Sequence, residues 1–201
     1  MLAAMSSRLA LVLADIDAAN AADPAKVDAD GAAQPAALVY GRRMSAMLER
    51  LVPQASEELA IAVRGQHIER FANPRADYPA GKAGYYRWRK AQMARHAERL
   101  AQIMTLHGYA QAAIERVGRI VRKENLGEDE EAQALEDAAA LVFLAYEFEP
   151  FVARGEHSDE KIADILAKTW AKMSERGRAA AHGLALPKRA LALLQRGLAN
   201  N

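Results

Sequence analysis

Residues 130–149, with the sequence EEAQALEDAAALVFLAYEFE, decide the fold class of this chain. Within this stretch the block 138–145 is apolar on every side of a helix, so no face of that helix is suited to water. A helix of this kind must be covered by its neighbours. We therefore predict that 130–149 is the central helix of an all-α fold, and that it ends at Pro150.

The composition agrees with packed helices. The chain has 201 residues, of which 51% are hydrophobic and 26% charged, and it is rich in alanine and leucine. This length favours one sizeable domain, which we expect to be a bundle of seven to eight helices. The absence of cysteine excludes disulfides and thiolate ligands. Apolar stretches near the N-terminus are interrupted by Arg8, Asp15 and Asp17, so we expect no membrane span or secretory segment and a cytoplasmic location.

Apolar periodicity and helix-breaking residues predict the other helices. These are residues 3–20, 36–51, 56–71, 85–107, 110–124, 159–174 and 187–198. Gly108 is expected to cap the fourth of them in the left-handed conformation, and Pro187 to open the last. Residues 21–35 are predicted to be a loop, so that 1–35 form an N-terminal helical arm and loop, and 36–201 the main domain.

The net charge of +1 hides an internal asymmetry. Residues 64–99 carry nine Arg and Lys against three acids, whereas residues 124–160 carry twelve acids against one base, which gives +6 and −11. Two interpretations remain open. The segments attract one another across solvent-facing sides, or a basic anion-binding segment faces an acidic one that holds a cation.

Four polar residues follow one stripe of the helix predicted at 85–107. Tyr85, Arg89, Gln92 and His96 are spaced by four, three and four residues, and Leu100 continues the same face. The polar side chains therefore share the face that should seek the core. Burying them is costly unless they meet partners or a ligand, so this stripe marks a candidate site.

Three further polar residues are predicted to point inward from other helices. His67 lies between Val63 and Phe71 at four-residue steps, Asp137 shares a stripe with apolar residues of the central helix, and Glu124 lies at the inward edge of its helix. Together with His96 they would form two imidazoles and two carboxylates, a set that suits zinc, manganese or iron.

An ion-pair network is the alternative to a metal site. In that arrangement Arg64, Arg89 and Lys123 neutralise Glu124 and Asp137, and the histidines only orient them. The loop containing Arg75 and Tyr78 adds donors that suit phosphate or carboxylate groups, although a solvated basic loop has the same composition.

Several motifs are similar to those of an uncharacterised family known as domain of unknown function 4202. They are Gln66-His67-Ile68, Pro74-Arg75 with Tyr78-Pro79, Gly84-Tyr85 with Trp88-Arg89, and residues 172–176, KMSER. This resemblance spans nearly the whole chain. It implies membership of the family and brings no activity with it.

A second resemblance concerns the HD superfamily of metal-dependent phosphohydrolases. Gln66-His67-Ile68 resembles its first ligand-bearing helix, and residues 135–144, which include Glu136-Asp137, look like its last. The resemblance implies that the helical bundle has an HD-like fold, and that His67 and Asp137 are the first and last metal ligands. The adjacent His-Asp pair of that superfamily is missing, because none of the five histidines is followed by aspartate.

These observations lead to two functional hypotheses. The first is a metal-dependent phosphohydrolase acting on a small phosphorylated metabolite or nucleotide. His67, His96, Glu124 and Asp137 would then hold the cation and act in catalysis, and the substrate would contact Arg64, Arg75, Tyr78, Tyr85, Arg89, Gln92 and Lys123. The second is a non-catalytic helical module that binds an anionic small molecule or a protein partner. The near-neutral total charge argues against a nucleic-acid partner.

Overall fold

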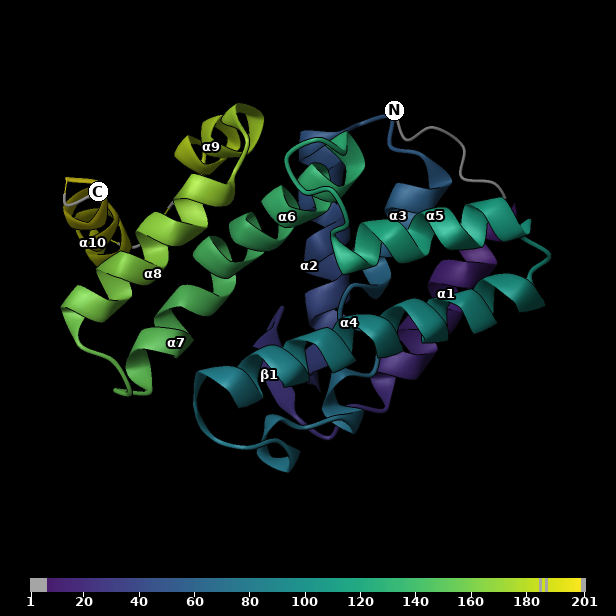
Figure 1. Ribbon diagram of the computed structural model, residues 1–201, viewed down its shortest axis with the longest axis horizontal. Coiled ribbons are helices and arrows are strands. Elements are labelled where there is room, and N and C mark those ends of the chain that lie inside the picture. The colour runs from purple at the N-terminus through teal and green to yellow at the C-terminus, as the bar shows by residue number, and fades with distance from the viewer. Residues whose placement is uncertain (1–6, 185, 187, 200–201) are drawn as a thin grey trace. The chain divides into compact units, whose positions relative to one another are not determined.

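The computed structural model describes residues 7–184, 186 and 188–199. The chain divides into two compact units, unit 1 (Met1–Leu135) and unit 2 (Glu136–Asn201), and each is described by itself. Figure 1 labels their helices and strand β1.

Unit 1 is a group of helices with one hairpin. Its helices are α1 (Ser7–Ala21), α2 (Ala36–Leu51), α3 (Glu57–Gly65), α4 (Gly81–Leu106), α5 (Gln111–Arg122) and the first part of α6 (Glu130–Val142). Helix α4 packs against α5, α3 packs against α2 and α5, and α1 contacts α2, α3 and α4. The expected all-α class is therefore confirmed for the described residues, in which the hairpin is the only sheet.

The core of unit 1 brings α3 close to α4. The side chains of Ile61 and Leu100 are fully buried, and a Cβ atom at Gly65 would lie only 2.4 Å from a methyl carbon of Leu100. Glycine at this position therefore permits a close approach of the two helices. The chain that leaves α3 consequently runs directly beside α4.

Local signals set two helix ends close to their predicted positions. The Ser56 hydroxyl accepts a hydrogen bond from the Leu59 N–H at 3.0 Å and caps the start of α3. Gly108 follows α4 with φ of 70°, so its predicted left-handed conformation is confirmed. Helix α4 begins at Gly81, four residues before the predicted start.

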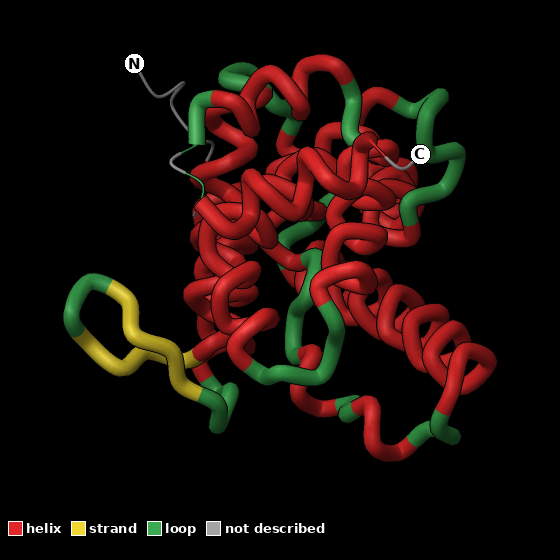
Figure 2. Tube along the Cα trace, turned by 90° about the vertical axis from the view of Figure 1, so that its left-hand side faces the viewer, coloured by secondary structure: helices red, strands yellow, loops and turns green. Residues whose placement is uncertain are grey.

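The loop predicted at residues 21–35 contains a hairpin instead. Strands β1 (Lys26–Ala29) and β2 (Ala32–Pro35) pair antiparallel, and Figure 2 shows them in yellow, extending from the helices of unit 1. Asp30 and Gly31 both have positive φ, 55° and 77°, which suits a tight two-residue turn. The buried Asp23 accepts hydrogen bonds from the backbone of Ala25 and Ala37, each at 2.9 Å. Strands this short leave little alternation in the sequence, and the turn signal alone was not sufficient to distinguish them from a loop.

The helix predicted for residues 56–71 ends early, at Gly65. Glu69 adopts a left-handed conformation with φ of 49°, and its N–H donates to the Asn20 side chain of α1 at 2.9 Å. Short 3₁₀ turns follow at Arg70–Ala72 and Arg75–Asp77. The prediction was wrong here because a partner 49 residues away in sequence stabilises the turn.

Unit 2 contains the rest of α6 and four further helices. The α6 helix continues into a π-helical turn, Phe143–Glu147, and then α7 (Phe148–Ala153), α8 (Asp159–Lys172), α9 (Glu175–His182) and α10 (Lys188–Ala199). Helix α8 packs against α10. No residue of the block 138–145 is exposed, so the prediction that this segment is covered on all sides is confirmed.

Two predictions about the helices need correction. The helix does not end at Pro150, because Pro150 lies in the first turn of α7, where proline is tolerated. The described residues contain ten α-helices instead of seven or eight, since the π-helical turn divides the central helix and α9 was not predicted.

The predicted role of Pro187 lies outside the described residues. None of the described helices combines the length and apolar character needed to cross a bilayer.

Candidate functional site

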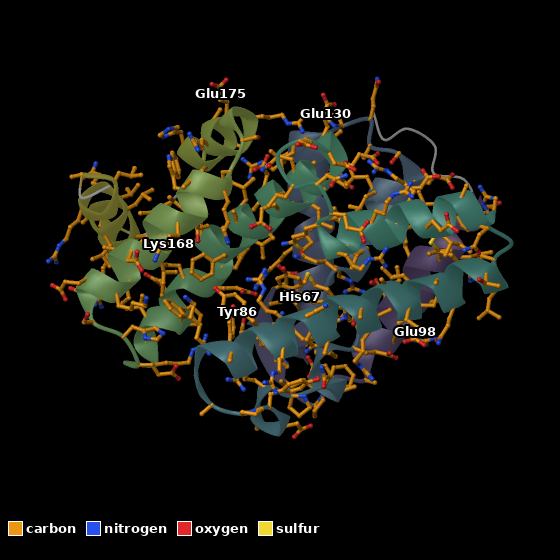
Figure 3. All side chains as sticks on the ribbon, viewed as in Figure 1. His67, Tyr86, Glu98, Glu130, Lys168 and Glu175 are labelled. Carbon is orange, nitrogen blue, oxygen red and sulfur yellow. The ribbon has the colours of Figure 1, made fainter. Side chains whose placement is uncertain are left out.

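The fold of unit 1 brings His67 and His96 together. Their ring centroids are 5.9 Å apart, with His67 in the turn after α3 and His96 on α4. Figure 3 shows His67 beside α4, between the labelled Tyr86 and Glu98 of that helix. The two imidazoles that the sequence singled out from separate segments thus lie in one cluster.

His96 presents a bare ring nitrogen inside the protein. Its Nδ1 lies 2.8 Å from the Ile68 carbonyl oxygen, which can only accept, so Nδ1 carries the proton. The other nitrogen, Nε2, then holds a lone pair. It is buried without a hydrogen-bond partner among the described residues, and the residue as a whole is 2% exposed.

Arg70 completes the cluster from the same turn as His67. Its guanidinium NH1 lies 2.8 Å from His67 Nε2, and because arginine only donates, this nitrogen of His67 is an acceptor. The guanidinium carbon of Arg70 also lies 4.7 Å from the centre of the Trp88 ring. On another side of His67, Tyr40 of α2 stacks at 4.4 Å between ring centroids.

The surroundings keep both imidazoles neutral near pH 7. Burial and the nearby Arg70 lower the pKa of His67 well below its ordinary value of 6.5, and Lys123 and Arg89 act in the same direction. Burial also lowers the pKa of His96 to about 4, against a smaller opposing effect of its hydrogen bond to Ile68. The charged groups that act most strongly on His67 are therefore basic.

Gln92 fastens the turn onto α4. Its Nε2 donates to the backbone carbonyls of Arg70 and Asn73, both at 3.0 Å, and Trp88 Nε1 donates to the same Asn73 carbonyl at 3.0 Å. Gln92 Oε1 and Asn73 Nδ2 are buried without hydrogen-bond partners among the described residues. Unsatisfied buried polar atoms are rare in proteins, and three of them occur in this one cluster.

A family model for Domain of unknown function (DUF4202) matches residues 10–194. The chain belongs to the DUF4202 family. No curated protein and no solved structure matches this DUF4202 protein. Membership of the family, expected from the motifs around His67 and Trp88, is thus confirmed, whereas the resemblance to the HD superfamily stays a prediction.

The two carboxylates predicted to be metal ligands have partners of their own. Asp137 belongs to unit 2 and is fully buried, as predicted. Its carboxylate accepts hydrogen bonds from the Ser174 backbone at 2.9 Å and from the Ser174 hydroxyl at 2.5 Å. Ser174 in turn caps α9, so Asp137 fixes the start of that helix.

Glu124 does not lie at the inward edge of its helix. Helix α5 ends at Arg122, and Lys123 turns into the left-handed conformation with φ of 56°. The helical spacing therefore no longer applies at Glu124, whose side chain is 43% exposed and pairs with Arg122 at 2.7 Å. Lys123, a predicted substrate contact, acts electrostatically on His67.

These placements do not provide a metal centre within the described residues. No group of three or more His, Asp or Glu side chains in this part of the chain is arranged to hold a metal ion. In the cluster itself, the lone pair of His67 Nε2 faces the Arg70 guanidinium, which would repel a cation. The zinc, manganese or iron site at His67, His96, Glu124 and Asp137 therefore stays a prediction.

Three of the predicted ligand-binding residues have structural roles. Arg64 forms two hydrogen bonds with the Asp17 carboxylate, at 2.7 and 2.8 Å, and ties α3 to α1. Arg75 donates to the carbonyls of the loop before α4. The Tyr78 hydroxyl donates to the Asn73 side chain at 3.1 Å. Their contacts are with this chain itself.

Arg89 and Tyr85 complete the predicted stripe on α4. Arg89 is partly buried and forms no hydrogen bond or ion pair within the described residues, although its charge acts on His67. Tyr85 is 41% exposed. The stripe therefore runs from the buried His96 and Gln92, through Arg89, to a tyrosine at the surface.

Sequence reasoning missed Arg70, Tyr40 and Asn73. Arg70 lies only three residues after His67, but the predicted continuous helix gave no reason to place its guanidinium on the ring of His67. The early end of α3 creates this contact. Tyr40 carried no local signal, because it meets His67 only through the packing of α2.

Proposed function

We propose that this DUF4202 protein binds an anionic small molecule, with phosphate as its charged group, at the cluster of His67, Arg70, Arg89, His96 and Lys123. The observation that carries the proposal is the convergence of basic groups on the partly buried ring of His67. Positive charges that approach one another in a partly buried place repel, and a bound anion relieves that repulsion.

The chemistry of the side chains supports an anion better than a cation. Arginine donates in a planar fork that matches phosphate oxygens, and lysine adds a point charge. The proton of neutral His67 resides on Nδ1, because its Nε2 accepts from Arg70, so this imidazole also offers a donor. Arg89 lacks an ion-pair partner within the described residues and is the residue most readily redirected to a ligand.

A nearby hollow is a weaker candidate for the same role. It has a volume of about 200 Å³ and is lined by Ile68, Glu69, Arg95, Glu98, Arg99 and Gln102. The two acids reduce the positive potential there, and Arg99 already pairs with Glu69 at 3.2 Å. The His67 cluster therefore remains the preferred anion site.

The metal-dependent phosphohydrolase stays a prediction with its own test. If elemental analysis of protein purified without chelator finds about one equivalent of a transition metal, and His67→Ala removes it, the hydrolase would be favoured over anion binding alone.

Binding to inorganic phosphate and pyrophosphate tests the proposal directly. Thermal unfolding is followed while either anion replaces chloride at constant ionic strength, and a ligand at 100 times its Kd should stabilise the protein by about 2.7 kcal/mol. Arg89→Gln should weaken binding roughly tenfold, as expected for a lost charge-assisted hydrogen bond. Arg87→Gln is the matched control, because Arg87 is exposed on the same helix and forms no hydrogen bond in the described structure.

Proton linkage provides a second measurement. A bound anion favours protonated imidazole and so raises the lowered pKa values of His67 and His96; binding should therefore be tighter at pH 5 than at pH 7. Sulfate is the probe for this experiment, because its charge is constant over the range. If neither phosphate nor pyrophosphate stabilises the protein saturably, or if Arg87→Gln and Arg89→Gln behave alike, the proposal is wrong.

A further inference from the structure

An exposed strip of basic and aromatic residues follows the first turns of α4. Lys82, Tyr86 and Lys90 are four residues apart and therefore share one face of the helix. Tyr85 adjoins this face, and its ring centroid lies 5.8 Å from that of Tyr86. Both lysines are exposed, and Tyr85 and Tyr86 are 41% and 58% exposed. We call these four residues the α4 strip; Figure 3 labels its Tyr86.

The local charge around the α4 strip is strongly positive. From residue 78 to residue 97 the chain has five basic residues and no acid, and Asp77 and Glu98 are the acids that bound this segment. The ammonium of Lys82 lies 6.0 Å from the centre of the Tyr86 ring. The total charge of +1 conceals this density, because the excess of acids is elsewhere in the sequence.

The loop that precedes α4 fixes the start of the helix that carries the α4 strip. Arg75 donates to the carbonyls of Tyr78 and Pro79 at 2.9 and 2.8 Å, which fixes the loop that leads into α4. Gly84 packs so closely on this loop that a Cβ atom would lie 1.8 Å from the Pro79 carbonyl oxygen. The exposed side chains thus project from a helix whose first turn packs on this loop, and a backbone already ordered before binding lowers the cost of association.

We propose that the α4 strip binds single-stranded nucleic acid. Lysines that follow one helix face suit the phosphates of a backbone, and exposed tyrosine rings suit the faces of unpaired bases. An acidic peptide would use the lysines but leave both rings without a role. A duplex would hide its base faces within the stack. The combination therefore favours a single strand, and this inference is independent of the anion site at His67.

Fluorescence anisotropy with a short labelled single-stranded RNA of mixed sequence tests this inference on the full chain. Tyr86→Ala should weaken binding roughly tenfold, since each base stack contributes about 5- to 150-fold, while Tyr86→Phe should retain it. The Lys82→Gln, Lys90→Gln double variant should flatten the slope of log affinity against log salt by about 1.4, or 0.7 for each lost phosphate contact. Tyr146→Ala is the control, because Tyr146 is also 44% exposed but is followed by Glu147 and Glu149.

Any one of three outcomes would overturn the inference. Equal binding of a duplex of the same sequence would show that the rings do not stack on bases. Equal binding of an oligoglutamate of similar charge would identify an acidic peptide as the partner. An equal loss of affinity in Tyr86→Ala and Tyr146→Ala would remove the α4 strip as the site. None of these results bears on whether pyrophosphate binds at Arg89, so the two proposals fail separately.

Discussion

Acidification should destabilise unit 1 through His96. The pKa of His96 is lowered from 6.5 to about 4 in the folded protein by burial. Between these values the unfolded chain binds more protons than the folded one, so stability falls as the pH falls from 6.5 toward 4. Linkage gives a loss of about 2 kcal/mol from His96 between pH 7 and pH 5. His67 acts in the same direction, because its pKa is lowered as well.

The His96→Asn variant isolates this contribution. In the parent protein His96 Nδ1 donates to the Ile68 carbonyl. Asparagine retains a donor close to the position of this nitrogen, but it does not titrate. Urea unfolding is followed at pH 7 and pH 5 by tryptophan fluorescence. A Trp170→Phe background leaves Trp88 of unit 1, which is 8% exposed, as the only reporter. The free energy lost on acidification should be smaller in His96→Asn by about 2 kcal/mol.

The test compares the change in unfolding free energy between pH 7 and pH 5 in the two proteins, and it does not depend on their stability at either pH. Any cost of the substitution itself is common to both pH values and cancels. If His96→Asn loses as much stability on acidification as the parent, to within about 0.5 kcal/mol, then His96 is not buried in its neutral form, and the electrostatic description of the cluster fails.

Three further substitutions test contacts within unit 1 or within unit 2. Ser174→Ala should cost roughly 2 kcal/mol of unfolding free energy in urea, because the buried carboxylate of Asp137 loses a donor and α9 loses its cap; a change below a few tenths would contradict this role. Gly84→Ala should destabilise unit 1 by more than about 2 kcal/mol in thermal unfolding, since its Cβ would lie 1.8 Å from the Pro79 carbonyl oxygen, and an unchanged Tm would refute that contact. Arg116→Gln should cost about 1 kcal/mol or less, because the arginine is 28% exposed although it pairs with two carboxylates; raising the salt concentration should shrink the difference, and a salt-independent cost would argue against an ionic origin.

The polar stripe predicted from helical spacing, Tyr85, Arg89, Gln92 and His96, illustrates how far sequence reasoning reached at the candidate site. Helical spacing alone placed Gln92 and His96 with Leu100 on one face, and all three are buried. The same spacing could not indicate where burial ends, and Tyr85 at the start of the stripe is exposed. Periodicity orders side chains around a helix, but the neighbours that cover each turn come from other segments.

The carboxylates show the opposite case. The sequence correctly indicated that Asp137 is buried and requires a partner, yet the partner is Ser174, 37 residues away in sequence. Glu124 was misplaced because one residue, Lys123, takes a left-handed conformation and ends the helix before it. A single change of φ reverses where the next side chain points, and no periodic pattern records it.

The sequence by itself determined the helical class, the left-handed cap at Gly108, and the family, because each depends on residues close together in the chain or on motifs that remain readable in it. Only the tertiary structure decided that Arg70 meets His67 and that α3 ends at Gly65. Those contacts arise where α1, α2 and α4 pack on one turn. Their free energy comes from atoms distant in sequence, which local preference does not encode.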